Sequence, residues 1–188
     1  LDSLLKRVQG TLRTDDIALH QISLAPEGFD ARFSALSRTY EYRIDDRGSK
    51  RNPLHHLFTY RSSFSLDDAA MNAVSQKLCG LHDFAAFCRP KPGATTIRHL
   101  THFAWTRDAD GILTGSVIAD AFCHSMVRSL VGSAVAVGRG RLSVDEVVEL
   151  RNKGERTSAW TTMAAKGLTL ISVEYPPDEL VASRALDT

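Results

Sequence analysis

The sequence predicts an α/β chain of the α+β type, in which an antiparallel mixed sheet carries its helices on one face. Three observations support this prediction. Stretches of alternating apolar and polar residues, typical of half-buried strands, are interspersed with stretches of helical spacing. Turn-forming residues separate them. The 188 residues are enough for one full hydrophobic core, or for two small halves that share one sheet.

The first residues predict a helix and then a strand. Apolar residues with helical spacing open the chain, so that it is expected to begin inside an amphipathic helix: Leu1, Leu4, Leu5 and Val8. Residues 16–24 alternate as a strand, which ends in turn chemistry at Ala25–Gly28. We assign residues 1–28 to the remainder of an N-terminal half.

A second group of elements begins with a strand and a helix. Thr39–Ile44 has strand composition. Residues 66–78 predict a helix, with Ser65 as its N-cap and Cys79-Gly80 at its end. Between them, Asp46–Pro53 is expected to be a polar surface loop.

The group continues with two strands, a helix and a last strand. Residues 95–106 and 112–119 are rich in β-formers, and the turn residues Asp108–Gly111 between them predict a hairpin. The apolar run 121–138 predicts a buried helix. Residues 168–175 alternate as a final strand, which two prolines stop.

The resulting order, β-α-β-β-α-β, matches the ferredoxin-like arrangement, in which helices cover one face of an antiparallel sheet. An extra short helix begins at the cap Ser143 and runs through Leu150. We assign residues 29–180 to this ferredoxin-like half and residues 181–188 to a tail.

Composition narrows the function classes. Three cysteines form an odd set in a sequence without a recognisable signal peptide, which predicts free thiols, a reducing compartment and a cytoplasmic location: Cys79, Cys88 and Cys123. No apolar stretch reaches the roughly 20 residues of a membrane span, so no membrane association is expected. The net charge of +1 neither indicates nor excludes a nucleic-acid partner.

Arg128 is the most informative residue. It stands near the middle of the apolar helix 121–138, and a guanidinium cannot lose its proton to escape burial, so an anion is expected to face it. His124, one turn earlier, would share its face. One interpretation is an ordinary buried ion pair with a local acid, such as Asp83 or Asp120, and the other is a functional cleft.

A tyrosine pair and a cysteine–histidine pair are two further candidates for a functional site. Tyr40 and Tyr42 share one face of their strand, where they pack in the core or offer a stacking platform for a base. Cys79 and His82 have metal-ligand spacing, but no second close pair follows them. No metal is therefore expected.

Four segments, taken in order, resemble the bacterial tRNA pseudouridine synthase A family. Phe29–Ala35 followed by Arg38–Tyr42 resembles the family's F-x-A-R-F-S-A…R-x-Y-x-Y segment. Leu81–Phe87 resembles G-x-x-D-F-x-x-F, and Ala121–Gly132 resembles A-F-x-x-x-M-V-R-x-x-V-G. Lys166–Leu170, with Tyr175-Pro176, resembles the closing segment. Together they extend from Asp16 to about Pro177.

The resemblance implies an enzyme that isomerises uridine to pseudouridine at positions 38–40 of the tRNA anticodon stem-loop, as a homodimer, without cofactor or metal. The family's nucleophilic aspartate lies in a G-R-T-D-A-G-V-H segment, which this sequence does not contain. Arg13-Thr14-Asp15 imitates that segment, but Asp16–Leu19 resembles a later strand of the family. Asp15 is therefore expected to be a loop residue, and this chain alone to be inactive.

The resemblance also implies roles for individual residues. Tyr40 corresponds to the active-site tyrosine, which packs on the target base and assists proton removal, and Arg128 to the arginine that pairs with the catalytic aspartate. Leu168 would shape the uracil pocket. Arg32 and Arg38 would contact tRNA phosphates or support the site. The target nucleotide must leave its stack to be reached.

Two alternatives from other classes remain open. One is a non-catalytic RNA-binding module of ferredoxin-like fold, and the other is a dimerisation domain in which a local acid satisfies Arg128. The surroundings of Arg128 discriminate between the enzyme fragment and a structural role. A position near Tyr40 and Leu168 without a local carboxylate favours the enzyme fragment, and a pair within the core away from Tyr40 favours a structural role.

Overall fold

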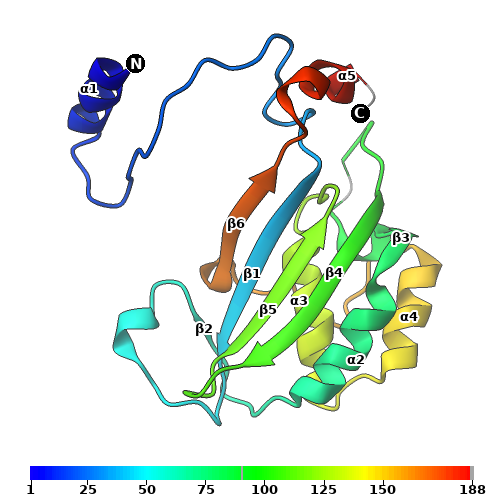
Figure 1. Cartoon of the computed structure of the whole chain (residues 1–188). Coiled ribbons are helices and arrows are strands. Elements are labelled where there is room, and N and C mark those ends of the chain that lie inside the picture. The colour runs from blue at the N-terminus through cyan, green and yellow to red at the C-terminus, as the bar shows by residue number, and fades with distance from the viewer. Residues whose placement is uncertain (90, 187–188) are drawn as a thin grey trace. The chain divides into compact units, whose positions relative to one another are not determined.

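The computed structural model describes residues 1–89 and 91–186 (Figure 1). These residues form two compact units, which are treated separately below. The first unit is Leu1–Ala35 together with the chain from Tyr175 on, and the second unit is Leu36–Glu174. The division proposed from the sequence, with boundaries after residues 28 and 180, stays a prediction.

The second unit is built on a six-stranded sheet in the order β2-β1-β5-β4-β3, in which β6 also pairs with β1. Its strands are β1 Ser37–Asp45, β2 Tyr60–Arg61, β3 Gly80–Asp83, β4 Ile97–Arg107, β5 Leu113–Ala119 and β6 Leu168–Glu174. The neighbours β6, β1, β5 and β4 are all antiparallel, whereas β2 runs parallel to β1. The mixed sheet is confirmed, as is the ferredoxin-like order, which β1, α2, β4, β5, α3 and β6 form; β2 and β3 are strands that were not predicted.

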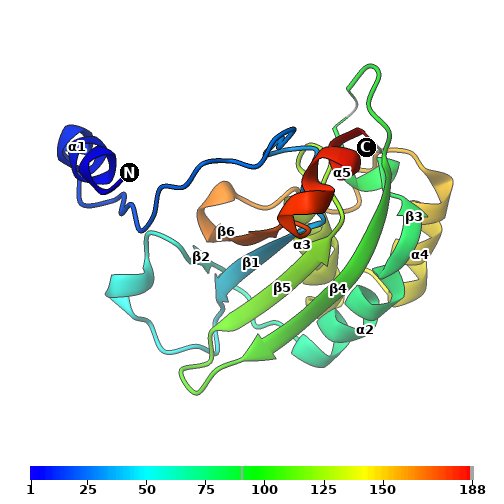
Figure 2. The same ribbon diagram turned by 45° about the horizontal axis from the view of Figure 1, so that its top comes forward.

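Helices of the second unit lie on one face of this sheet (Figures 1 and 2). They are α2 Asp68–Leu78, α3 Met126–Gly138 and α4 Val144–Lys153. The unit also contains the short 3-10 helices η1 Pro53–His55, η2 Ala85–Phe87 and η3 Ala165–Gly167. Among the described residues, no helix is long and apolar enough to cross a membrane. Helix α3 is the innermost of the three by burial, since every residue of it except Arg128 is buried.

Local chemistry explains where several elements begin and end. Ser143 and Glu146 form a reciprocal capping box at the start of α4. In the β4–β5 hairpin, the Asp108 carboxylate accepts the backbone N–H groups of Asp110 and Ile112, and Gly111 takes the left-handed conformation that glycine tolerates. These are the turn residues that predicted the hairpin.

Two helix starts were predicted wrongly. The carboxylate of Asp67, not Ser65, caps α2 by accepting the N–H of Ala70 at 2.9 Å. Helix α3 begins at Met126 rather than at residue 121, because Ser125 has a φ of 69°, in which a right-handed helix cannot continue. The loop 120–125 therefore precedes the helix, and it carries His124 outside it.

The first unit contains helix α1 Asp2–Leu12, the 3-10 helix η4 Asp178–Leu180 and helix α5 Val181–Leu186. Residues 181–186, which were predicted as part of a tail, are thus helical, and the last two residues of that tail lie outside the described residues. The ring of Tyr175 packs on Phe29, with centroids 5.0 Å apart, and its hydroxyl donates to the carbonyl of Ala31.

The strand predicted at residues 16–24 is wrong. Within the described residues, no strand lies between α1 and β1, and the chain there is largely exposed. Leu24, which the alternation placed on an apolar face, is 85% exposed. A strand needs a partner for its backbone hydrogen bonds, and no described segment pairs with this one.

A buried ion pair joins β4 to the loop after β1. Asp46 is 1% exposed, although its segment was predicted to be a surface loop. Its carboxylate accepts Nη1 and Nη2 of Arg107 at 3.1 and 3.2 Å, and also the N–H of Leu66. Burial by itself raises the pKa of Asp46, but these hydrogen bonds and that of Gly48 outweigh it and hold the pKa below its usual value.

We expect Arg107→Met to destabilise the second unit by about 3 kcal/mol, because it leaves a buried carboxylate without its partner. The loss is measured by urea unfolding at neutral pH. The matched control is Arg43→Met, which breaks a more exposed pair, with Glu41, and should cost less than about 1 kcal/mol.

The same pair predicts a pH dependence. Because folding lowers the pKa of Asp46 from 3.8, its stabilisation is present above that value and is lost as the pH falls through the folded-state pKa. The difference between wild type and Arg107→Met should therefore shrink in acid. A difference that stays constant from neutral pH to pH values below 3.8 would contradict this account.

Candidate active site

Arg128 lies in the first turn of α3, and its guanidinium is half-buried. Nη2 donates to the hydroxyl of Ser125 at 3.2 Å, and Nη1 donates to the carbonyl of Met163 at 3.4 Å. The backbone carbonyl of Arg128 in turn accepts the N–H of Met163 at 3.1 Å. Both ends of this residue therefore hold the segment that leads toward β6.

Both side-chain partners of Arg128 are neutral. No carboxylate within the described residues forms an ion pair with it. The two local acids considered for this role are engaged elsewhere: Asp83 accepts from Ala85 and Thr96, and Asp120 accepts from His99 and Ala121. A guanidinium has five N–H donors, so Arg128 keeps the capacity to bind an anion.

Tyr42 of β1 contacts the same segment, Met163-Ala164, at the residue next to the one that Arg128 contacts. It is fully buried, and its hydroxyl donates to the carbonyl of Ala164 at 2.8 Å. Burial raises the pKa of this hydroxyl well above its usual value, nearby Tyr60 adds to the rise, and Arg128 opposes it. Tyr42 is therefore a neutral donor that fixes Ala164, next to the residue that contacts Arg128.

Tyr40 lies on the same face of β1 as Tyr42, as their spacing predicted. Its half-buried ring meets Phe122 of the loop 120–125 edge to face, with centroids 5.3 Å apart. On the neighbouring strand β6, Leu168 is the register partner of Tyr42. The structure thus gathers Tyr40, Tyr42 and Leu168 on adjacent strands beside the first turn of α3.

Two glycines of the motif segments permit this packing. A Cβ at Gly132 of α3 would collide with the backbone carbonyl of Thr161, so the helix lies directly against that chain. A Cβ at Gly167 would lie 2.7 Å from ring atoms of Tyr42. Both positions need the absence of a side chain for close approach rather than an unusual backbone conformation.

The remaining predicted residues are more scattered. Arg38 donates to the carbonyl of Asp120 at 2.6 Å, at the base of the loop 120–125. Arg32 belongs to the first unit, where its guanidinium lies over the ring of Phe33. His124 is exposed and contributes only its backbone carbonyl, which accepts the N–H of Arg89. The polar stripe of His124 and Arg128 is therefore not formed.

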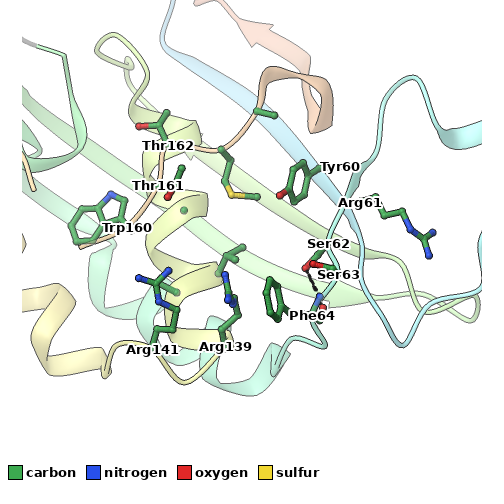
Figure 3. Close-up of a pocket in the computed structure, with 15 residues that line it drawn as sticks. Tyr60, Arg61, Ser62, Ser63, Phe64, Arg139, Arg141, Trp160, Thr161 and Thr162 are labelled. Carbon is green, nitrogen blue, oxygen red and sulfur yellow. Dashed lines mark hydrogen bonds between the residues drawn. The ribbon is translucent and has the colours of Figure 1, made fainter. Parts of the chain in front are cut away.

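A cavity of about 660 Å³ borders the segment that Arg128 and Tyr42 hold (Figure 3). Met163 and Ala164 line it, together with Arg139 and Arg141, and no described acidic residue lines it; Arg61 also borders it, but its guanidinium points away and pairs with Asp45 at 2.7 Å. The guanidinium of Arg139 lies 3.5 Å from the centre of the Phe64 ring. Such a cationic cavity suits phosphate groups.

Sequence reasoning missed this cavity. The available signal was Gly138–Arg141, a Gly-Arg-Gly-Arg run at the end of α3, which is too short to indicate a binding site by itself. The rest of the cavity lining includes residues 60–64 and 160–164, which lie about 100 residues apart in the sequence. No local pattern in the sequence brings these two segments together.

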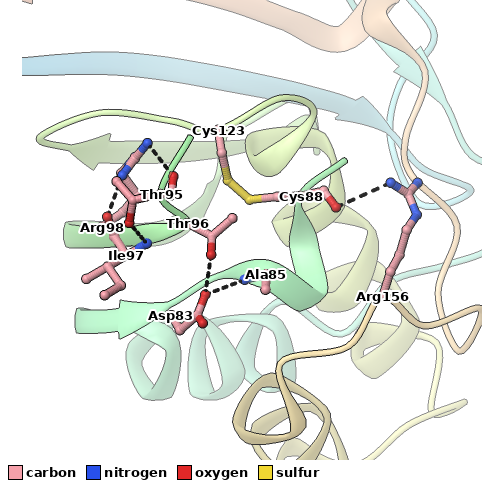
Figure 4. Close-up of a disulfide and its surroundings, with 9 residues drawn as sticks. All are labelled: Asp83, Ala85, Cys88, Thr95, Thr96, Ile97, Arg98, Cys123 and Arg156. Carbon is pink, nitrogen blue, oxygen red and sulfur yellow. Dashed lines mark hydrogen bonds between the residues drawn. A yellow bond between two sulfur atoms is a disulfide. The ribbon is translucent and has the colours of Figure 1, made fainter. Parts of the chain in front are cut away.

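In the structure the expectation of three free thiols does not hold for two of them. Cys88 and Cys123 are joined as a disulfide, and Cys79 is free (Figure 4). Their Cα atoms lie 5.7 Å apart, because the end of η2 packs against the loop 120–125. This distance falls within the usual span of about 4.4–6.8 Å for disulfides.

Comparison with known proteins agrees with this arrangement. The family model described as tRNA pseudouridine synthase matches residues 74–176. The chain is 50% identical over 188 residues to tRNA pseudouridine synthase A of Leifsonia xyli, a match that covers 100% of this chain and 65% of the relative. It is 48% identical over 187 residues to the protein of the same name from Frankia casuarinae, with 98% and 67% covered.

A third relative, tRNA pseudouridine synthase A of Mycobacterium leprae, is 45% identical over 187 residues, with 98% of this chain and 64% of the relative covered. The ferredoxin-like sheet and the motif residues around α3 and β1 are the features of one class of proteins, the RNA-modifying isomerases that the family model describes. The chain belongs to the tRNA pseudouridine synthase family. It spans about two thirds of the length of the curated relatives it matches.

We expect Gly132→Ala to destabilise the second unit by about 1–3 kcal/mol, because the new methyl group must displace the backbone at Thr161. The matched control is Gly10→Ala in α1, where a Cβ meets no atom within 4 Å. Urea unfolding followed by tryptophan fluorescence measures both. Equal midpoints for Gly132→Ala and wild type would contradict the close approach of α3 to this segment.

Proposed function

We propose that this chain is the larger part of an enzyme that isomerises uridine to pseudouridine in the anticodon stem-loop of tRNA. Membership of the family supports the reaction. The observation that carries the proposal is the guanidinium of Arg128, which is half-buried, has only neutral partners and lies close to Tyr42 and the segment Met163-Ala164. It is built to receive a carboxylate.

In this proposal, Arg128 positions the nucleophilic aspartate, which belongs to a segment that these residues do not include. The planar fork of a guanidinium fits the two oxygens of a carboxylate, and such pairing keeps the acid ionised. Met163 accepts from Nη1 and Ser125 from Nη2, one contact on each terminal nitrogen, and together they set the orientation of the guanidinium. The remaining donors are left for the acid.

Tyr40 and Leu168 would then define the place of the flipped uracil. The ring of Tyr40 would pack on the base and assist removal of the proton from C5, while Leu168 would bound the pocket. The aspartate would attack, the glycosidic bond to nitrogen would break, and the turned uracil would rejoin the sugar through carbon. Phe122 supports this assignment because its edge-to-face contact holds the ring of Tyr40 in place.

Binding of the tRNA backbone would fall to arginines. Arg38 and Arg32 are proposed from the family resemblance, and Arg139 and Arg141 of the 660 Å³ cavity have the chemistry for phosphate. We also propose a homodimer and a cytoplasmic location, as the resemblance implies. Light scattering after gel filtration of the full-length gene product should give twice the mass of one chain, and the mass of a single chain would contradict the dimer.

The dimerisation-domain alternative required a local acid on Arg128, and the described residues supply none. A non-catalytic RNA-binding module is the remaining alternative. It predicts tRNA binding by the full-length gene product without any isomerisation.

This chain by itself should form no pseudouridine when incubated with unmodified tRNA transcripts, because it lacks the carboxylate that starts the reaction. Release of tritium from C5-labelled uridine measures the reaction. The full-length gene product is the positive control. Turnover by the purified chain alone would overturn the assignment of the nucleophile to another segment.

Arg128→Lys in the full-length gene product should lower kcat on the order of 10²-fold, because lysine offers a point charge in place of the fork that orients the acid. KM for tRNA should change little. The matched control is Arg47→Lys at an exposed position. Equal kcat values for Arg128→Lys and wild type would exclude a positioning role for the guanidinium.

A further inference from the structure

We propose that Cys88 and Cys123 form a reversible thiol–disulfide modification site, whose co-substrate is a low-molecular-weight disulfide. In the proposed cytoplasmic setting the pair would usually be reduced, and it would close when small disulfides accumulate. This inference concerns the chemistry of two side chains and does not depend on the proposed isomerase activity.

The two segments that carry the cysteines are held together by more than the sulfur atoms. The N–H of Arg89 donates to the carbonyl of His124 at 2.9 Å, so each cysteine has a neighbour in a bond between the segments. This bond does not require the disulfide. The thiols would therefore remain close to each other after reduction.

Both cysteines also stand on backbone that is fixed locally. Cys88 directly follows η2, and its N–H donates to the carbonyl of Ala85, the first residue of that helix. The carbonyl of Cys123 accepts the N–H of Met126 at the start of α3. The carbonyl of Cys88 accepts from Arg156, and Asp83 ties the start of η2 to Thr96 (Figure 4). A bond between preorganised partners costs little ordering entropy.

Exposure sets the order of the chemical steps. Cys88 is 1% exposed, whereas Cys123 is only partly buried. The Cys123 thiolate attacks one sulfur of the small disulfide, a mixed disulfide forms, and one small thiol leaves with a proton. The Cys88 thiolate then attacks the Cys123 sulfur and releases the second thiol. Two electrons pass to the co-substrate, and two thiols reverse the reaction.

The position of Cys123 makes this site relevant to Arg128. The residue before it, Phe122, packs on Tyr40, and two residues after it Ser125 accepts a hydrogen bond from Arg128. Closure of the disulfide fastens the loop 120–125 to η2. The oxidised form should therefore restrain both contacts of the loop with the candidate active site.

The experiment counts thiols in this chain. The reduced protein is incubated with oxidised glutathione, denatured, alkylated and weighed intact. Wild type should change from three alkylated cysteines to one, with no glutathione attached, and peptide mapping should place the remaining label on Cys79. The matched control Cys79→Ser should change from two labels to none. Three labels on oxidised wild type, or a disulfide that includes Cys79, would overturn the proposal.

Single variants test the order of attack. Cys88→Ala should trap the mixed disulfide, so that Cys123 carries a glutathione adduct, whereas Cys123→Ala should leave the buried Cys88 mostly unmodified. Equal adducts on the two variants would refute the assigned order. If a variant does not fold, the wild-type label count still decides whether the pair closes.

Hydrogen exchange reads out the effect on the loop. Amides of residues 121–127 should exchange more slowly in oxidised than in reduced wild type, and Cys123→Ala should show no such difference. Identical exchange in both redox states of wild type would refute the restraint on the site. None of these readouts involves RNA, so their failure is distinguishable from failure of the proposed function.

Discussion

The segment between α4 and β6 must pass through a narrow space between α3 and β1, and the candidate site depends on how it does so. Gly132 lets the helix touch the chain at Thr161. The backbone carbonyl of Arg128 accepts the N–H of Met163, and its guanidinium donates to the Met163 carbonyl. The buried hydroxyl of Tyr42 donates to the carbonyl of Ala164. These contacts join a helix, a central strand and the strand that bears Leu168 into one rigid frame.

This frame explains why an arginine can remain half-buried without a carboxylate. Its hydrophobic stem lies among buried residues of α3, and two neutral oxygens satisfy part of its donor set. The arrangement keeps a charged group ordered yet incompletely paired, as the proposed function requires. Asp46 and Arg107 show the opposite case, a pair satisfied on all sides.

The loop 120–125 links this frame to the rest of the second unit. It packs Phe122 on Tyr40, accepts Arg38 at its base and supplies Ser125 to Arg128. Its left-handed residue Ser125 interrupts what would otherwise be a longer helix. The same loop carries Cys123, so that the backbone irregularity, the candidate site and the cysteine pair occupy one stretch of chain.

Local sequence by itself determined the α+β class, the β-α-β-β-α-β order, the hairpin at Asp108 and the solitary charge on α3, because alternation, capping and turn chemistry act over a few residues. Tertiary structure alone decided the rest. Leu24 has strand spacing but no partner, Cys88 meets Cys123 across 35 residues, and the neutral partners of Arg128 include one from a segment beyond α4. Such pairings depend on which distant segments pack together, and no short-range pattern records that.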